Sequence, residues 1–177
     1  MITIESYSEI IFPLIKHCCI ESQSKEYQKD HLWYLYRQAF YGYGMFQDKN
    51  LYSENAFNKF NELYAKYLSE TTKRNKIPKI LTIERINWSE QPLIDKKREE
   101  LLFEHMYTGT MFREDITRLY HKGNLDVTEI SKLIRLKYKI CLITKEENLN
   151  LHKTHRGFDP VEYYQSIGGI KILNLKE

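Results

Sequence analysis

An acidic residue followed directly by a histidine, Glu104-His105, is the first place in this 177-residue chain where two side chains could do chemistry together. The pair follows the apolar run 101–103, so it should lie at the end of a regular element. A carboxylate can bind a divalent metal ion while the neighbouring imidazole accepts a proton from water. The pair therefore predicts a metal ligand and a general base; the alternative is a solvated pair at a helix end.

A second stretch, about 45 residues further on, carries amide and imidazole side chains. Asn148, His152 and His155 are spaced i, i+4 and i+7, which places them on one face of a helix if the helix extends that far. Asn150 faces away from that stripe. The alternative is that the two histidines interact only with the negative end of the helix dipole.

Together the two stretches, within residues 101–155, resemble the HNH or ββα-metal endonucleases. That family pairs an acidic-His dipeptide at the end of one strand with a later strand that leads into a helix. The resemblance implies that His105 is the general base that activates water. It implies also that Glu104, with His152 or His155, holds one divalent ion, Mg²⁺ or Mn²⁺, on the scissile phosphate.

The same resemblance assigns a role to the asparagines of the second stretch. Asn148 or Asn150 would orient His105 through a hydrogen bond. His105 and Asn148 are 43 positions apart, so the helix expected over 127–136 must be inserted between the two parts of the motif.

The order of helices and strands expected along the chain predicts an α+β fold in a single domain. An N-terminal helical layer is expected over 1–70, and a small sheet flanked by helices is expected over 71–177. Hydrophobic periodicity predicts helices over 6–20, 31–45, 53–68, 96–103, 112–120, 127–136, 145–152 and 161–166. The apolar runs 138–143 and 170–175 are expected to be strands that pair with each other.

Two helix starts carry a capping-box pattern, in which a side chain at the N-cap and one three residues later satisfy each other's backbone N–H groups. They are Asp126 with Glu129, and Thr144 with Glu147. The second box places the start of a helix directly after the expected strand 138–143.

Charge is unevenly distributed along the chain. The net charge is +3, which is too small to indicate nucleic acid by itself. Residues 71–139, however, hold 15 Lys/Arg against 10 Asp/Glu, a net of +5, whereas residues 1–70 have a net of −2 and 140–177 a net of zero. This middle stretch is expected to contact DNA phosphates if the chain is a nuclease; the alternative is ordinary solvated helix faces. A homodimer is expected for a sequence-specific enzyme of this size, because palindromic sites mirror two-fold symmetry.

The three cysteines, Cys18, Cys19 and Cys141, are expected to be buried free thiols, because no C-x-x-C spacing occurs. No signal peptide or membrane span is visible. A cytoplasmic protein without a membrane partner is therefore expected.

Aromatic residues make up 14% of the chain and include 14 tyrosines, many of them within 27–67. Rings at helical spacing predict packing within the helical layer. They would also suit a protein partner, so the alternative function is a small non-enzymatic interaction protein, such as an immunity protein, an antitoxin or a phage-encoded inhibitor, that uses this aromatic helical face.

Overall fold

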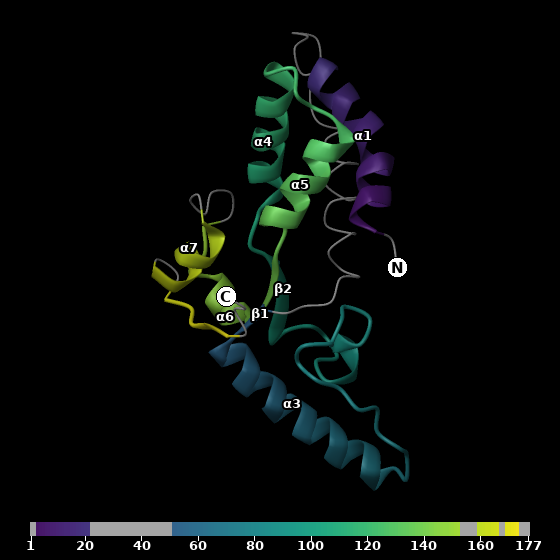
Figure 1. The fold of residues 1–177 in the computed structure, drawn as a ribbon. Coiled ribbons are helices and arrows are strands. Elements are labelled where there is room, and N and C mark those ends of the chain that lie inside the picture. Colours follow the sequence, from purple (N-terminus) through teal and green to yellow (C-terminus); the bar gives the residue numbers. More distant parts are fainter. Residues whose placement is uncertain (1–2, 22–50, 153–158, 167–168, 174–177) are drawn as a thin grey trace. The chain divides into compact units, whose positions relative to one another are not determined.

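The computed structural model describes residues 3–21, 51–152, 159–166 and 169–173, which form six α-helices and a four-stranded mixed sheet (Figure 1). The helices are α1 (Ile4–Glu21), α3 (Glu54–Lys73), α4 (Gly109–His121), α5 (Val127–Lys137), α6 (Lys145–Asn148) and α7 (Pro160–Ser166). The strands are β1 (Leu51–Ser53), β2 (Leu101–His105), β3 (Ile140–Thr144) and β4 (Ile172–Leu173), and a single 3₁₀ turn, η1, spans Gln91–Leu93.

The α+β class is confirmed, but the strands alternate with helices along the chain. The expectation of an all-helical segment over 1–70 is wrong, since β1 lies within it. The helix expected over 31–45 lies outside the described residues. No helix in the described ranges is both long enough and apolar enough to cross a bilayer.

The chain divides into two compact units. Unit 1 contains α1 and the 107–138 segment with α4 and α5, whereas unit 2 contains the described residues from 51 to 106 and from 139 to 173. Residues 107–138 are therefore an insertion between two strands of unit 2.

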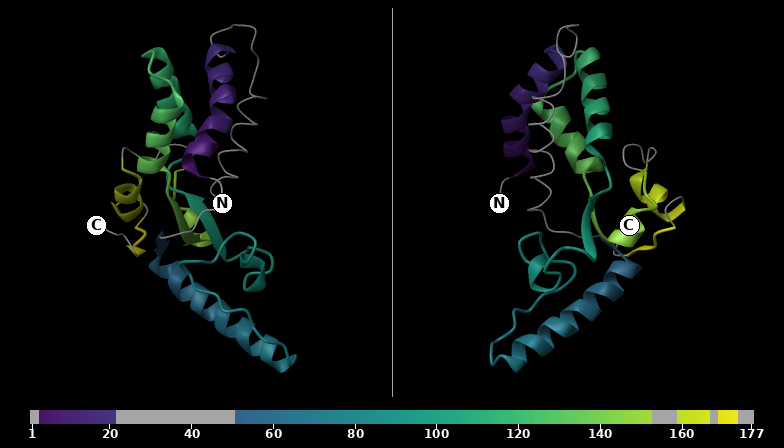
Figure 2. Two further views of the ribbon diagram at one scale, coloured as in Figure 1. Left: turned by 45° about the vertical axis from the view of Figure 1, so that its right-hand side comes forward. Right: turned by 180° about the vertical axis from the view of Figure 1, so that it is seen from behind.

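The described part of unit 1 is built from three helices whose apolar stripes face one another, and Figure 2 shows α1 beside α5 in both views. Tyr7, Ile11, Ile15 and Cys18 repeat at helical spacing on α1 and are all buried. They pack with buried residues of the insertion, namely Tyr107, Phe112, Ile116, Ile130 and Ile134. The side chain of Asp126 accepts the Glu129 N–H and starts α5, as the sequence predicts. Cys18, Cys19 and Cys141 are free and buried, as expected.

A polar cluster around Asp115 ties α4 to the end of α5. The Asp115 carboxylate accepts hydrogen bonds from Tyr107 Oη at 2.5 Å and from Lys137 Nζ at 2.7 Å, and Arg118 forms an ion pair with it at 2.8 Å. Burial opposes ionisation of this carboxyl, but the hydrogen bonds from Lys137 and Tyr107 and the charges of Lys137 and Arg118 outweigh it. The pKa of Asp115 is therefore lowered.

Asp115→Asn should destabilise the protein at pH 7 by about 1 to 2 kcal/mol, because charge-assisted hydrogen bonds are lost. A carboxyl whose pKa is lower in the folded state stabilises the fold at pH values above its unfolded-state pKa of about 3.9. This stabilisation disappears as the pH falls through the folded-state pKa. Urea unfolding at pH 7 and at successively lower pH measures the difference between wild type and variant. A deficit that stays constant down to the acid limit of the folded state would contradict the assignment.

The sheet of unit 2 has the order β2-β3-β1-β4. Strand β3 pairs antiparallel with β2 and parallel with β1, so both of its edges are occupied. The expected pairing of the last strand with 138–143 is therefore wrong, and β4 pairs antiparallel with β1 instead, with Tyr52 opposite Leu173.

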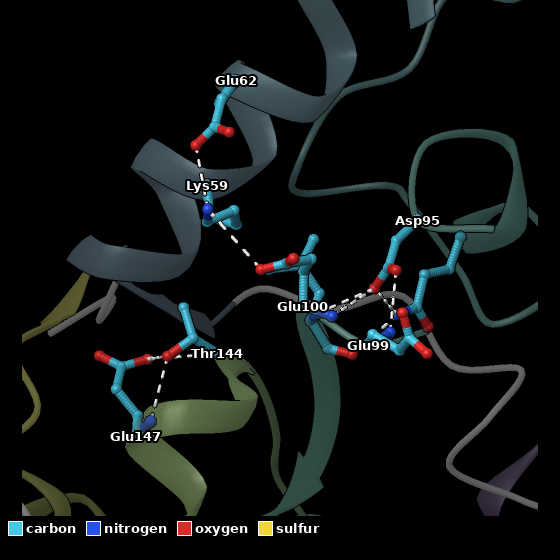
Figure 3. A network of polar contacts seen from close by, with 9 residues as sticks. Lys59, Glu62, Asp95, Glu99, Glu100, Thr144 and Glu147 are labelled. Carbon is cyan, nitrogen blue, oxygen red and sulfur yellow. Dashed lines mark hydrogen bonds and ion pairs between the residues drawn. The ribbon is translucent and has the colours of Figure 1, made fainter. Parts of the chain in front are cut away.

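The expected helix over 96–103 is also wrong, because Asp95 organises a turn there. Its buried carboxylate accepts the backbone N–H groups of Glu99, Glu100 and Leu101 at 2.9 to 3.1 Å (Figure 3). Arg98, at φ +53°, departs from right-handed helical geometry. The chain leaves this turn directly into β2, and Lys59 of α3 forms an ion pair with Glu100 at 3.6 Å.

Tyrosines of α3 hold an extended segment of their own chain. The Lys79 N–H donates to Tyr67 Oη at 2.9 Å, and the Leu81 N–H donates to Tyr64 Oη at 3.3 Å. The rings of Phe60, Tyr64 and Tyr67 stack along α3, with centroids 5.7 and 6.1 Å apart. This part of the aromatic stripe therefore packs within the chain.

Tyr67→Phe should loosen this extended segment, because the Lys79 N–H loses its acceptor. Trypsin cleavage after Lys76 and Lys79 is expected to become several-fold faster, since proteolysis follows local opening. Tyr120→Phe in α4 is the matched control and should leave these two cleavage rates unchanged. Mass spectrometry of timed digests measures the rates, and equal rates in wild type and Tyr67→Phe would refute the role of this hydrogen bond.

Candidate functional site

Glu104 and His105 end β2, an edge strand of the sheet, rather than a helix. Glu104 lies opposite Cys141 of β3, and His105 lies opposite Ile140. Successive residues of a strand point to opposite faces, so the two side chains leave the sheet on different sides. Because no strand pairs with the outer edge of β2 in the described sheet, a ligand at that edge could meet both of them.

The face that carries Glu104 is covered by the C-terminal part of unit 2. Its core contains Met106 of the β2 end, Cys141 of β3, Leu151 of the loop after α6, and Tyr163 and Tyr164 of α7. Burial raises the pKa of Cys141, and the charges of Glu147 and Glu104 raise it further. Both carboxylates therefore lie near this thiol, and Cys141 is a buried core residue rather than a nucleophile.

The capping box at the start of α6 is present as predicted. Thr144 Oγ1 accepts the Glu147 N–H at 3.1 Å, and the Glu147 carboxylate accepts the Thr144 N–H at 2.8 Å (Figure 3). The same carboxylate also accepts hydrogen bonds from Ser53 Oγ at 2.6 Å and Asn55 Nδ2 at 3.1 Å, at the start of α3. Glu147 thus joins the N-termini of two helices that follow the parallel strands β1 and β3.

Helix α6 is shorter than predicted, because it ends at Asn148 rather than His152. After it, the N–H groups of Leu149, Asn150 and Leu151 bond to carbonyls three residues back, which tightens the chain into turns. The expected i, i+4, i+7 stripe on one helix is therefore wrong. The tightened chain buries Leu151 and leaves the side chain of His152 exposed.

The structure places the predicted site residues at different points of unit 2. The backbone N–H of His152 donates to Tyr163 Oη at 2.7 Å, so the chain at His152 covers the face that carries Glu104. Asn148 is half-buried and Asn150 is exposed, and both follow Thr144 in the chain. Thr144 pairs with Leu101, which lies at the opposite end of β2 from His105. That end lies about 13 Å along the strand from His105. The orienting role of Asn148 or Asn150 stays a prediction.

His155 lies outside the described residues. Within the described part of the chain, no three or more His, Cys, Asp and Glu side chains form a group that could hold a metal ion. Glu104 carries carboxylate oxygens and His152 an exposed imidazole, donor types that divalent ions such as Mn²⁺ accept.

Sequence reasoning missed two features of unit 2. The buried carboxylate of Asp95 organises the turn before β2. In the sequence, the one sign of this turn is an acidic residue directly ahead of the charged run 96–100. The contacts of Glu147 with Ser53 and Asn55 join residues more than 90 positions apart, which no local pattern reveals.

Comparisons of this chain with protein-family models, with curated proteins and with solved structures found no match.

Proposed function

We propose that unit 2 is a metal-dependent endonuclease of ββα type that hydrolyses phosphodiesters of DNA. One observation carries this proposal: two antiparallel neighbouring strands, β2 and β3, lead into α6, and the acidic-His dipeptide ends the first strand. The Met106 N–H bonds to the Lys139 carbonyl at 3.0 Å, so the two strands remain paired up to the residues that flank the insertion.

The insertion accounts for the long gap in the sequence between the two parts of the motif. Residues 107–138 belong to unit 1 and number 32. Without them, 11 of the 43 positions that separate His105 from Asn148 would remain. Strand, strand and helix then follow one another directly along the chain of unit 2, which supports the proposal.

In the proposed reaction, His105 accepts a proton from water, and the water oxygen attacks the scissile phosphorus. The bond from phosphorus to the 3′ oxygen breaks, and the leaving oxygen takes a proton from solvent. Glu104, with His152 or His155, would hold a metal ion, which would supply electrostatic stabilisation of the charge that develops on the phosphate.

The edge position of β2 makes this arrangement workable, although Glu104 and His105 belong to opposite faces. A phosphate that approaches the free edge at the end of β2 lies between the two faces of the sheet. A carboxylate from one side and an imidazole from the other can then reach it.

Cleavage of an end-labelled DNA duplex in the presence of Mn²⁺ tests the proposal. Products with a 5′ phosphate and a 3′ hydroxyl are expected, with formation abolished by EDTA and by His105→Ala. His17→Ala, which replaces an exposed histidine of α1, is the matched control and should cleave at the wild-type rate. Cleavage by His105→Ala at that same rate would exclude the proposed base.

A second candidate function, a non-enzymatic interaction protein, is favoured by one surface feature of unit 2. Ile77 and Ile80 lie on the extended segment held by α3, and their exposed fractions are 97% and 85%. A contact with another protein would remove both of these apolar side chains from water. A protein of this kind would cleave no nucleic acid under any of the conditions above.

A further inference from the structure

A hollow of about 230 Å³ lies between α4 and α5 of unit 1. Its basic lining residues are Arg118 and Lys122 from the end of α4 and Lys132 and Lys137 from α5. A second hollow, of about 480 Å³, shares Arg118 and Lys122 with the first and adds Arg113 and His121. The two hollows therefore form one surface with basic side chains along both helices, which we call the α4–α5 surface.

Three acidic residues line this surface, namely Glu114, Asp115 and Glu129. Asp115 binds both Lys137 and Arg118, and Glu129 binds Lys132 at 2.5 Å. Lys122 forms no ion pair with any residue in the described ranges. The five Lys and Arg side chains that line the surface outnumber its three carboxylates, so the surface keeps an excess of positive charge.

The cations are also accessible and regularly spaced. The side chains of Arg118 and Lys132 are 62% and 58% exposed. Arg118 and Lys122 are four residues apart on α4, which places their Cβ atoms about 6 Å from each other. Duplex DNA carries a charge about every 1.7 Å along its axis, so each of these cations can meet a phosphate.

We propose that the α4–α5 surface binds the backbone of duplex DNA, the class of substrate proposed for unit 2. The identity of the ligand rests on the proposed function, whereas the binding itself does not require cleavage. The binding is independent of base sequence, because it is made by Lys and Arg side chains to phosphates. Residues 107–138, which contain both helices, hold 6 Lys/Arg against 4 Asp/Glu, and this excess favours a continuous polyanion over a protein with separate charges.

The test is fluorescence anisotropy of the full-length protein with a labelled 20-base-pair duplex in EDTA, so that no cleavage occurs. If about three phosphates are neutralised, affinity should fall roughly 40-fold between 50 and 200 mM salt. Lys122→Glu/Lys132→Glu should weaken binding at least about 10-fold at 50 mM salt and lower the salt slope by about 2.

The matched control reverses two exposed charges on α3, Lys66→Glu/Lys73→Glu, and should change the affinity less than about 2-fold. Lys122→Gln/Lys132→Gln neutralises the same two cations without introducing repulsion from Glu129, and it should give an intermediate loss. Circular dichroism verifies that each variant is folded. Equal losses in the test and control pairs would overturn the proposal.

Competition decides the class of ligand. Unlabelled duplex should displace the probe, whereas polyglutamate of equal total charge should do so far less well. Equal displacement by polyglutamate would overturn DNA as the occupant. Glu104→Gln should bind the duplex as wild type does, so loss of cleavage with intact binding separates failure of the nuclease from failure of the α4–α5 surface.

Discussion

Glu104→Gln is expected to slow Mn²⁺-dependent DNA cleavage by about 100-fold or more, because a neutral amide replaces the carboxylate proposed to hold the ion. The substitution keeps the size of the side chain, and Glu104 is only half-buried at the end of β2, so the sheet should remain intact. Raising the Mn²⁺ concentration should restore part of the rate, since the lost interaction is with the metal ion.

The control for this prediction is Glu100→Gln, which replaces an exposed carboxylate just before β2. It should cleave at close to the wild-type rate. The rate is measured under single-turnover conditions over a series of Mn²⁺ concentrations. A Glu104→Gln protein with the wild-type rate and the wild-type metal dependence would remove Glu104 from the site.

Glu147→Ala is expected to have the largest effect on stability, about 3 kcal/mol. The Glu147 carboxylate is buried and accepts hydrogen bonds from Ser53 Oγ, Asn55 Nδ2 and the backbone N–H of Thr144. Its removal leaves several donors at the starts of α3 and α6 without an acceptor, and each buried donor left in this way costs about 1 to 3 kcal/mol.

Glu146→Ala is a closely matched control, because Glu146 is the exposed neighbour of Glu147 on the same short helix. Its expected cost is within about 0.5 kcal/mol. Urea unfolding followed by circular dichroism should show a midpoint lower by about 1 M or more for Glu147→Ala. Equal midpoints for the two variants would show that the Glu147 contacts contribute little to stability.

The sequence predicted the elements whose signals are local. The helix starts at Asp126 and Thr144 follow from side chains that bond to backbone N–H groups three residues away, and the structure confirms both. The stripes of α1 and α3 are equally local, because apolar residues at helical spacing lie within one element. The buried free cysteines followed from their spacing in the same way.

Elements that depend on distant partners could not be predicted. Strand β1 has three residues, and its pairing partners in β3 lie about 90 positions away. Periodicity predicts a helix over the run before Glu104, since it does not register the role of the Asp95 side chain. That side chain accepts backbone N–H groups and forms a turn in place of the helix. The site was predicted as a set of residue types, whereas its division between two sheet faces follows from residues 101–105 forming a strand rather than the end of a helix.

The most direct test of the central claim is conversion of supercoiled plasmid to nicked and linear forms in the presence of Mg²⁺ or Mn²⁺. The proposed function predicts conversion by the wild-type protein, no conversion in EDTA, and rates at least about 100-fold lower for Glu104→Gln and His105→Ala. A folded wild-type protein that cleaves neither single-stranded nor double-stranded DNA with either ion would contradict it. Equal rates in wild type and both variants would contradict it as well.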